Sequence, residues 1–237
     1  MSDPRPALTA CAWILADEGH ESGLAGQLTA RGPEHGTFWT LPLGVAFDEA
    51  EDSAWLLIDD TLAVRAGDGA FGIREPNPAT RFHLWVYRAR PDVRAIVHTH
   101  PPAASALAAA GAPLVVAHMD ATPLFDDMAF LAEWPGLPTA DREGEIIAGA
   151  LGDRHAILLA HHGLLAAGRS VAEATFLGVF IERMARLQFD AARVGGVRPV
   201  DAGEARRARD FLRTDRIMGL TFDAWARKAA RRRGRTR

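Results

Sequence analysis

Short apolar segments alternate with helical patterns through the middle of the chain, and this alternation most constrains the possible fold. Strands are expected at 24–31, 38–43, 55–59, 93–97, 114–117, 156–160 and 164–167. Helices are expected at 7–18, 80–90, 102–110, 142–151, 171–194, 202–213 and 221–233. Residues 121–140 show no clear period and predict a loop. The order indicates a layered α/β domain with a helix-rich end.

The 237-residue chain has no Pro/Gly/Ser-rich linker and no repeat, so we expect a single domain over 1–237. Residues 196–237 are expected to form a helical C-terminal extension with a basic tail. No run of 18 apolar residues occurs, and the apolar stretch 8–16 runs into two acids, so neither a membrane span nor a secretory signal is expected. A single cysteine, Cys11, excludes an intramolecular disulfide. We expect a buried thiol and a cytoplasmic protein.

Charge is distributed unevenly along the chain. The net charge is only −3, but the last twelve residues hold seven basic groups, which leaves 20 basic and 30 acidic residues in the rest. Such a tail can bind nucleic acid, but a solvated helix end, or a tail that reaches an acidic neighbouring subunit, is the simpler interpretation. We therefore expect no nucleic-acid partner.

Lysine is nearly absent, and this excludes two kinds of chemistry. Lys228, in the basic tail, is the only one. A Schiff-base enzyme needs a lysine desolvated in a pocket, and a Walker phosphate loop needs one after its glycines. An electron sink, if the reaction needs one, must be a metal or a cofactor.

Histidines stand at the ends of two predicted strands. His98 and His100 lie two residues apart in Ile96-Val97-His98-Thr99-His100-Pro101, so an extended chain would present both on one face. A second pair precedes a glycine in His161-His162-Gly163, where the chain can turn and approach closely. Three neutral imidazoles with an open position are typical of a catalytic metal site for zinc, manganese, iron or cobalt. The spacing alone does not establish that they converge.

Several motifs together resemble the class II aldolase/adducin head family. They are Arg81-Phe82-His83, Tyr87 to Val93, Ile96 to His100, His161 to Leu165 and Gly23 to Arg31, and the resemblance covers about residues 5 to 195. It implies a three-layer α/β/α sandwich around a largely antiparallel sheet. It also implies a divalent metal, most simply zinc, on His98, His100 and His162, and a homotetramer with active sites between subunits. Members include sugar-phosphate aldolases, an epimerase, a dehydratase, decarboxylases and non-catalytic adducin heads.

The chain departs from the sugar-phosphate aldolases where they hold phosphate and transfer protons. Their Ser-Ser-Glu is matched by Asn77-Pro78-Ala79, so alanine stands where their acid/base glutamate would be. Gly26-Gln27 replaces their Gly-Asn, and Leu43 replaces a threonine. Because an anion site consists of hydrogen-bond donors, these losses argue against a phosphorylated substrate.

The surviving residues predict a metal-dependent carbon–carbon lyase, either an aldolase or a decarboxylase, for a small non-phosphorylated hydroxy- or oxo-acid. Asp120 and His161 are the candidates for the missing proton donor. Gly26, Gln27, Asn77 and His118 are expected to line the substrate pocket or support its ligands, and His83 to pack on a helix face. Two alternatives remain. One is an iron oxygenase using the same histidines, and the other is a non-catalytic adducin-like binding module.

Overall fold

An eight-stranded sheet forms the centre of the computed structural model, which describes residues 3–137 and 140–234. The strand order is β4-β3-β2-β1-β5-β8-β7-β6, and every neighbouring pair is antiparallel except β6 and β7. The strands are β1 (Gln27–Arg31), β2 (Thr37–Thr40), β3 (Leu56–Asp59), β4 (Val64–Ala66), β5 (Ala95–Thr99), β6 (Met128–Leu131), β7 (Ala156–Leu159) and β8 (Gly163–Gly168). The expectation of a largely antiparallel sheet is confirmed.

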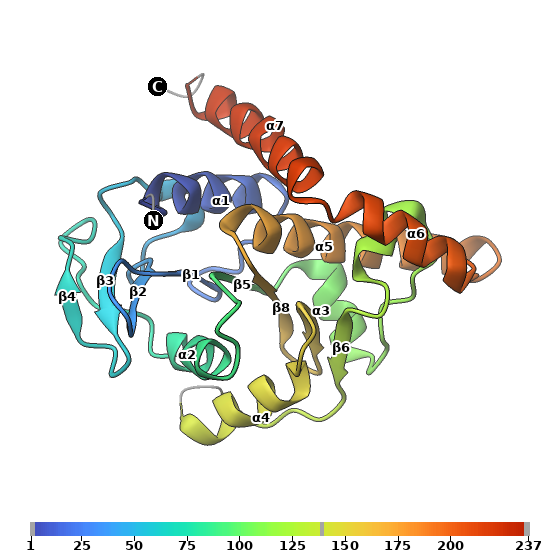
Figure 1. The fold of residues 1–237 in the computed structure, drawn as a ribbon, viewed down its shortest axis with the longest axis horizontal. Helices are drawn as coiled ribbons and strands as arrows, with labels where there is room; N and C mark the ends of the chain where they lie inside the picture. The colour runs from blue at the N-terminus through green and yellow to red at the C-terminus, as the bar shows by residue number, and fades with distance from the viewer. Residues whose placement is uncertain (1–2, 138–139, 235–237) are drawn as a thin grey trace.

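Helices cover both faces of this sheet and make the three expected layers (Figure 1). On one face lie α2 (Thr80–Ala89) and α4 (Asp141–Leu151). On the other lie α1 (Arg5–Asp17), α3 (Pro102–Ala109) and α5 (Val171–Val194), with α7 (Asp215–Gly234) outside α1 and α5. Two short 3₁₀ turns, η1 (Phe47–Glu49) and η2 (Met119–Leu124), complete the elements together with α6 (Ala202–Leu212).

Alternating side chains of β5 supply two separate cores. Ala95 and Val97 belong to the core under α1 and α5, whereas Ile96 belongs to the core under α2 and α4. Since side chains two apart share a face, His98 follows Ile96 onto the α2 side. The alternation therefore decides which layer covers the first of the predicted metal ligands.

The structure corrects three element predictions. Residues 114–117 are not a strand, because Val115 donates its N–H to the Gln188 side chain and Val116 accepts from Val200, outside any sheet ladder. The segment 121–140, predicted as a loop, contains β6, and its residues 138–139 lie outside the described part. The last helix begins at Asp215, six residues before the predicted start.

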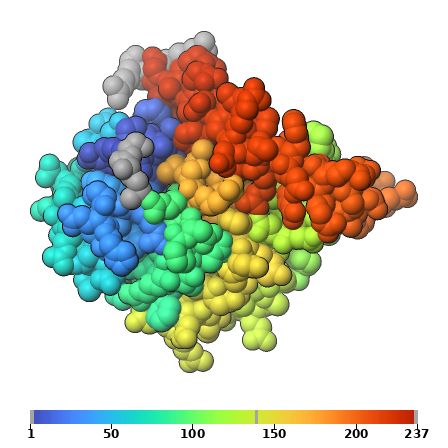
Figure 2. Space-filling view, viewed as in Figure 1, coloured from blue at the N-terminus to red at the C-terminus, as the bar shows by residue number. Residues whose placement is uncertain are grey.

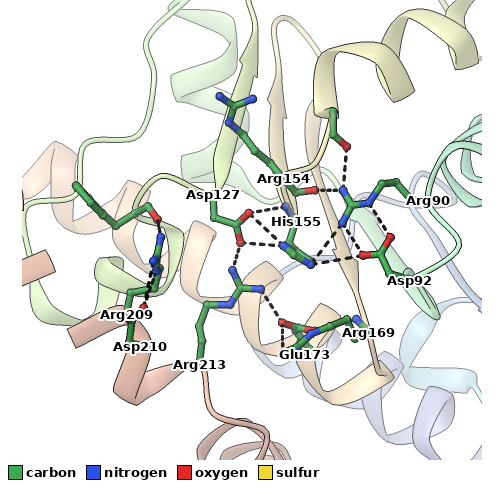
Figure 3. Close-up of polar contacts among 12 residues, drawn as sticks. Arg90, Asp92, Asp127, Arg154, His155, Arg169, Glu173, Arg209, Asp210 and Arg213 are labelled. Carbon is green, nitrogen blue, oxygen red and sulfur yellow. Dashed lines mark hydrogen bonds and ion pairs between the residues drawn. The ribbon is translucent and has the colours of Figure 1, made fainter. Parts of the chain in front are cut away.

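The C-terminal helices are joined to the body by an ion-pair network at the start of β6 and β7 (Figure 3). Arg213, between α6 and α7, pairs with Asp127 and with Glu173 of α5. His155 contacts the same Asp127 carboxylate at 3.0 Å. Figure 2 shows α6 and α7, coloured red, lying along one side of the body.

Part of the basic tail is already paired within the chain. Arg232 and Arg233 lie 3.3 and 3.5 Å from Asp17 at the end of α1, and Lys228 lies 3.8 Å from Glu18. The acidic complement expected on a neighbouring subunit is thus found, for these residues, on α1 of the same chain. No helix in the described ranges is both long and apolar enough to span a membrane.

Candidate metal centre

Three histidines converge at one end of the sheet. His98 lies in the buried strand β5, His100 follows the end of that strand, and His162 lies in the turn between β7 and β8. One ring nitrogen from each lies within 4.8 Å of the others, and the Nε2 atoms of His98 and His100 are 3.0 Å apart. Such a group of nitrogens can hold one metal ion and leave a coordination position open.

The orientation of His98 fits a metal ligand. Its Nδ1 lies 2.8 Å from the carbonyl oxygen of Leu164, and because a carbonyl can only accept, Nδ1 carries the proton. Nε2 is then unprotonated and directed toward the other two histidines. A backbone carbonyl on the second ring nitrogen is how metal-bound imidazoles are commonly held.

Burial keeps all three imidazoles neutral at physiological pH. Loss of hydration lowers the pKa of His98 well below its ordinary value, and the nearby His162 and His100 lower it further. Burial likewise lowers the pKa of His100, and it lowers that of His162 to about 4. Because a protonated imidazole cannot bind a metal, this environment favours the ligand form.

The turn that carries His162 lies close to the backbone of Thr99 and the ring of His100. His161 has φ +56°, in the left-handed region that non-glycine residues rarely adopt, and its side chain is exposed. At the next position after His162, a Cβ on Gly163 would lie 2.5 Å from the Thr99 carbonyl oxygen and 2.6 Å from Cδ2 of His100. The turn therefore points two adjacent histidines apart, and the glycine lets one of them reach the cluster.

Gly26 and Gln27, which were predicted to line the substrate pocket, lie beside His98. Gln27 is paired with His98 across β1 and β5, so the two side chains share a face. Gln27 is 6% exposed, and its Oε1 has no hydrogen-bond partner among the residues that the structure describes. Gly26 has φ +107°, and a Cβ there would lie 3.2 Å from the His98 carbonyl oxygen.

The start of α2 approaches the cluster from the other side. The Phe82 and His83 rings lie 4.8 and 6.2 Å from the His98 ring between centroids. Ala79 precedes His83 by one helical turn, on the same face. The Asn77 side-chain oxygen accepts the Ala79 N–H at 3.0 Å, in the turn that leads into α2.

His118 is exposed and Asp120 is half-buried, and they contact each other. Nδ1 of His118 accepts the Asp120 N–H at 3.1 Å and lies 3.9 Å from its carboxylate. Neither has a hydrogen bond to the histidine cluster within the described chain. The single chain thus does not join the predicted proton donors, Asp120 and His161, to the three convergent histidines.

Two further histidines near the cluster were not predicted as site residues. His20 contacts Oγ1 of Thr99, the residue between His98 and His100, at 2.8 Å. His83 contacts Thr29 Oγ1 at 2.9 Å. Burial lowers the pKa of each to about 3, and within the described part of the chain Nε2 of each has no hydrogen-bond partner. For His83, its place in Arg81-Phe82-His83 was a usable signal, but nothing in the sequence singles out His20.

A family model described as the class II aldolase and adducin N-terminal domain matches residues 7–189. The chain belongs to this family. An L-fuculose 1-phosphate aldolase from Glaciozyma antarctica PI12 superposes with a TM-score of 0.87 and 29% identity, covering 98% of this chain and 90% of that one. The class II aldolase fold is therefore established for this protein.

Two curated relatives have names that point to different reactions. A 4-hydroxy-3-prenylphenylpyruvate oxygenase/4-hydroxy-3-prenylbenzoate synthase from Streptomyces roseochromogenus subsp. oscitans is 32% identical over 78% of this chain and 66% of its own length. The decarboxylase NovR from Streptomyces niveus is 31% identical over 78% of this chain and 68% of its own length. The matched region thus spans about two thirds of each relative.

Proposed function

We propose that this protein is a metal-dependent carbon–carbon lyase, most simply a decarboxylase, for a non-phosphorylated hydroxy- or oxo-acid. The convergence of His98, His100 and His162 supports it most strongly, because three neutral imidazoles at one point fit a divalent ion. Zinc is the simplest choice, and manganese, iron and cobalt suit the same ligands. The metal would supply a Lewis acid that polarises a substrate carbonyl and stabilises developing negative charge.

The environment of α2 favours decarboxylation over sugar-phosphate cleavage. Ala79 cannot transfer a proton, and loss of carbon dioxide needs no base to begin it. The Asn77 side-chain oxygen is engaged by the Ala79 N–H in the turn before α2. Gln27, with a buried unpartnered oxygen beside His98, can accept a hydrogen bond from a substrate hydroxyl. The Gln27 oxygen is an acceptor, so it suits the hydroxyl of a hydroxylated acid better than the oxygens of a phosphate.

A proton must still reach the product carbon. In the single chain His161 is exposed, and Asp120 has no hydrogen bond to the three histidines among the described residues, so we infer that one of them acts in a homotetramer whose sites lie between subunits. In such an assembly His118, which contacts Asp120, would support it.

An iron oxygenase remains the second candidate, and the name of the Streptomyces roseochromogenus relative favours it. The same three histidines would hold iron, and the reaction would consume dioxygen. Dependence on dioxygen separates the two candidates. The adducin-like binding role has no comparable support, since it requires no open metal position.

The test is turnover of hydroxy- and oxo-acids by protein loaded with zinc, manganese or iron, measured in air and without oxygen. We expect carbon dioxide release without oxygen and no inhibition by millimolar inorganic phosphate. Asp120→Asn should lower turnover about 10²–10⁴-fold at unchanged metal content if Asp120 is the proton donor. Turnover that requires oxygen would replace the lyase with the oxygenase, and tight phosphate inhibition would contradict the substrate class.

A further inference from the structure

A buried carboxylate on α5, that of Glu182, binds the start of α3. The Glu182 side chain is 3% exposed. Its Oε1 accepts the N–H of Ala103 at 3.1 Å, and its Oε2 accepts the N–H of Ala104 at 2.8 Å. Both carboxylate oxygens are therefore engaged on the first turn of α3, the helix that follows His100 in the chain.

The first turn of α3 has two amides without a partner in the helix. Pro101 and Pro102 have no N–H, and the first bond within the helix runs from the Ser105 N–H to the Pro101 carbonyl oxygen at 2.9 Å. The N–H groups of Ala103 and Ala104 are left, and the carboxylate accepts both. Because Pro101, at the capping position, has no side-chain oxygen, the acceptor must come from another element.

The negative charge of Glu182 suits this position. The N-terminus of a helix carries partial positive charge, and hydrogen bonds to a carboxylate are stronger than those between neutral groups. Arg186, one turn later on α5, lies 3.3 Å from Oε1, but its side chain is 65% exposed. The two amides of α3 are therefore the buried partners of this carboxylate, and these bonds hold α3 against α5.

Two prolines connect the first turn of α3 to a candidate metal ligand. Pro101 and Pro102 are the two residues between His100 and Ala103. A proline ring fixes φ near −65°, and Pro101 has φ −71°. A shift of the first turn of α3 therefore moves His100, because few bonds between them can rotate.

The same face of α5 also contacts the strand that carries His98. Gly178 lies one helical turn before Glu182, and a Cβ built on it would lie 3.2 Å from Cγ1 of Val97. Val97 directly precedes His98 in β5. α5 thus fixes the chain by close packing before the pair His98 and His100, and by hydrogen bonds after it.

We infer that Glu182 is a positioning residue of the metal centre, which keeps His100 where it converges with His98 and His162. This inference rests on the proposed metal-dependent function. Glu182 acts through the backbone of α3, so its substitution should change the geometry of the ligands without removing one of them. A purely structural glutamate would affect stability alone.

Titration of the metal-free, full-length protein with cobalt(II) tests this inference, because the visible absorption of bound cobalt reports the geometry of its ligands. Glu182→Gln keeps the side-chain size but turns an amide NH₂ group toward one of the two N–H donors. We expect it to weaken cobalt binding about tenfold or more and to shift the absorption, as loss of a group that orients a metal ligand does.

Glu173→Gln is the matched control. Glu173 is also a buried carboxylate of α5, at 1% exposed, but it pairs with Arg169 and Arg213 instead of α3. Its substitution should lower stability and leave both the cobalt affinity and the absorption at their wild-type values.

A second variant covers the case in which Glu182→Gln does not fold. Glu182→Asp keeps both acceptor oxygens but is one methylene shorter, so it draws α3 toward α5 and should also shift the absorption, with helical content checked by circular dichroism. The inference is overturned if both Glu182 variants give the wild-type spectrum and affinity, or if Glu173→Gln changes them equally. A wild type that binds no cobalt would overturn the proposed metal centre and this inference with it.

Discussion

Two neighbouring atoms allow only glycine at position 163. A Cβ there would lie 2.5 Å from the Thr99 carbonyl oxygen and 2.6 Å from Cδ2 of His100. The nearest of these is backbone, so a side chain there must displace the strand that carries two candidate ligands. Metal affinity and local stability should therefore respond together to a single methyl group.

Gly163→Ala is accordingly predicted to weaken metal binding about tenfold or more and to destabilise the fold by about 1–3 kcal/mol. Gly149→Ala is the matched control, because a Cβ there has nothing within 4 Å and alanine favours a helix by about 1 kcal/mol. Metal titration and urea denaturation of both variants measure the two effects. Metal binding at wild-type strength in Gly163→Ala would show that the close approach is not needed.

At the scale of single residues, those with a regular spacing were easier to predict than isolated ones. His98 and His100 were predicted to share a face because two-residue spacing in a strand requires it. Asp120 was chosen from proximity in sequence alone, and in the structure it is half-buried and contacts His118, so its role as proton donor stays a prediction. The hydrogen bond of His20 to Thr99 joins residues 79 apart, and no local pattern encodes such a contact.

Elements with strong local signals were predicted closely. The bounds of α5 and its Ser170 cap are as expected, since a long amphipathic period and a capping hydroxyl act locally. β6 was missed although Met128 to Leu131 are all apolar, because so short a run without alternation does not distinguish a strand from other structure. Its position depends on pairing with β7, a contact between distant segments.

The network around Arg213 is the element-scale feature with the clearest energetic consequence (Figure 3). The Arg213 side chain is 12% exposed, and it pairs with Glu173, which is 1% exposed. Arg213→Met should destabilise the protein by about 3 kcal/mol, because it leaves a buried carboxylate short of a partner. Hydrogen exchange should show the loss first in α6 and α7.

Arg207→Met is the control for this prediction. Arg207 pairs with Glu204 on the exposed surface of α6, where an ion pair contributes about 0–1 kcal/mol. Equal loss of unfolding free energy in the two variants would show that the buried network does not hold the C-terminal helices.

At the scale of the whole molecule, the C-terminal helices are part of the main core. Met218, Phe222 and Ala229 of α7 are buried in the core that contains α1 and α5. We therefore infer that residues 1–237 form one domain, with 196–237 as an integral extension. Its attachment could not be read from the sequence, since it depends on contacts between the two ends of the chain.

We expect a partner subunit to complete the site, because His161 is exposed and Asp120 is half-buried in the single chain. Phe71 is 71% exposed and Leu24 is 56% exposed, so apolar surface is also available for such a contact. Sedimentation at micromolar concentration should give an oligomer, with a tetramer expected. A monomer with full activity would contradict a site shared between subunits.

Metal content, measured together with turnover in protein purified without added ions, is the most direct test of a metal centre on His98, His100 and His162. We predict about one divalent ion per chain in the wild type, and parallel loss of metal and turnover in alanine variants of each of the three histidines. His161→Ala, one residue away with its side chain in solvent, should keep its metal. Full metal occupancy in His162→Ala, or metal loss in His161→Ala instead, would contradict the assignment of this centre.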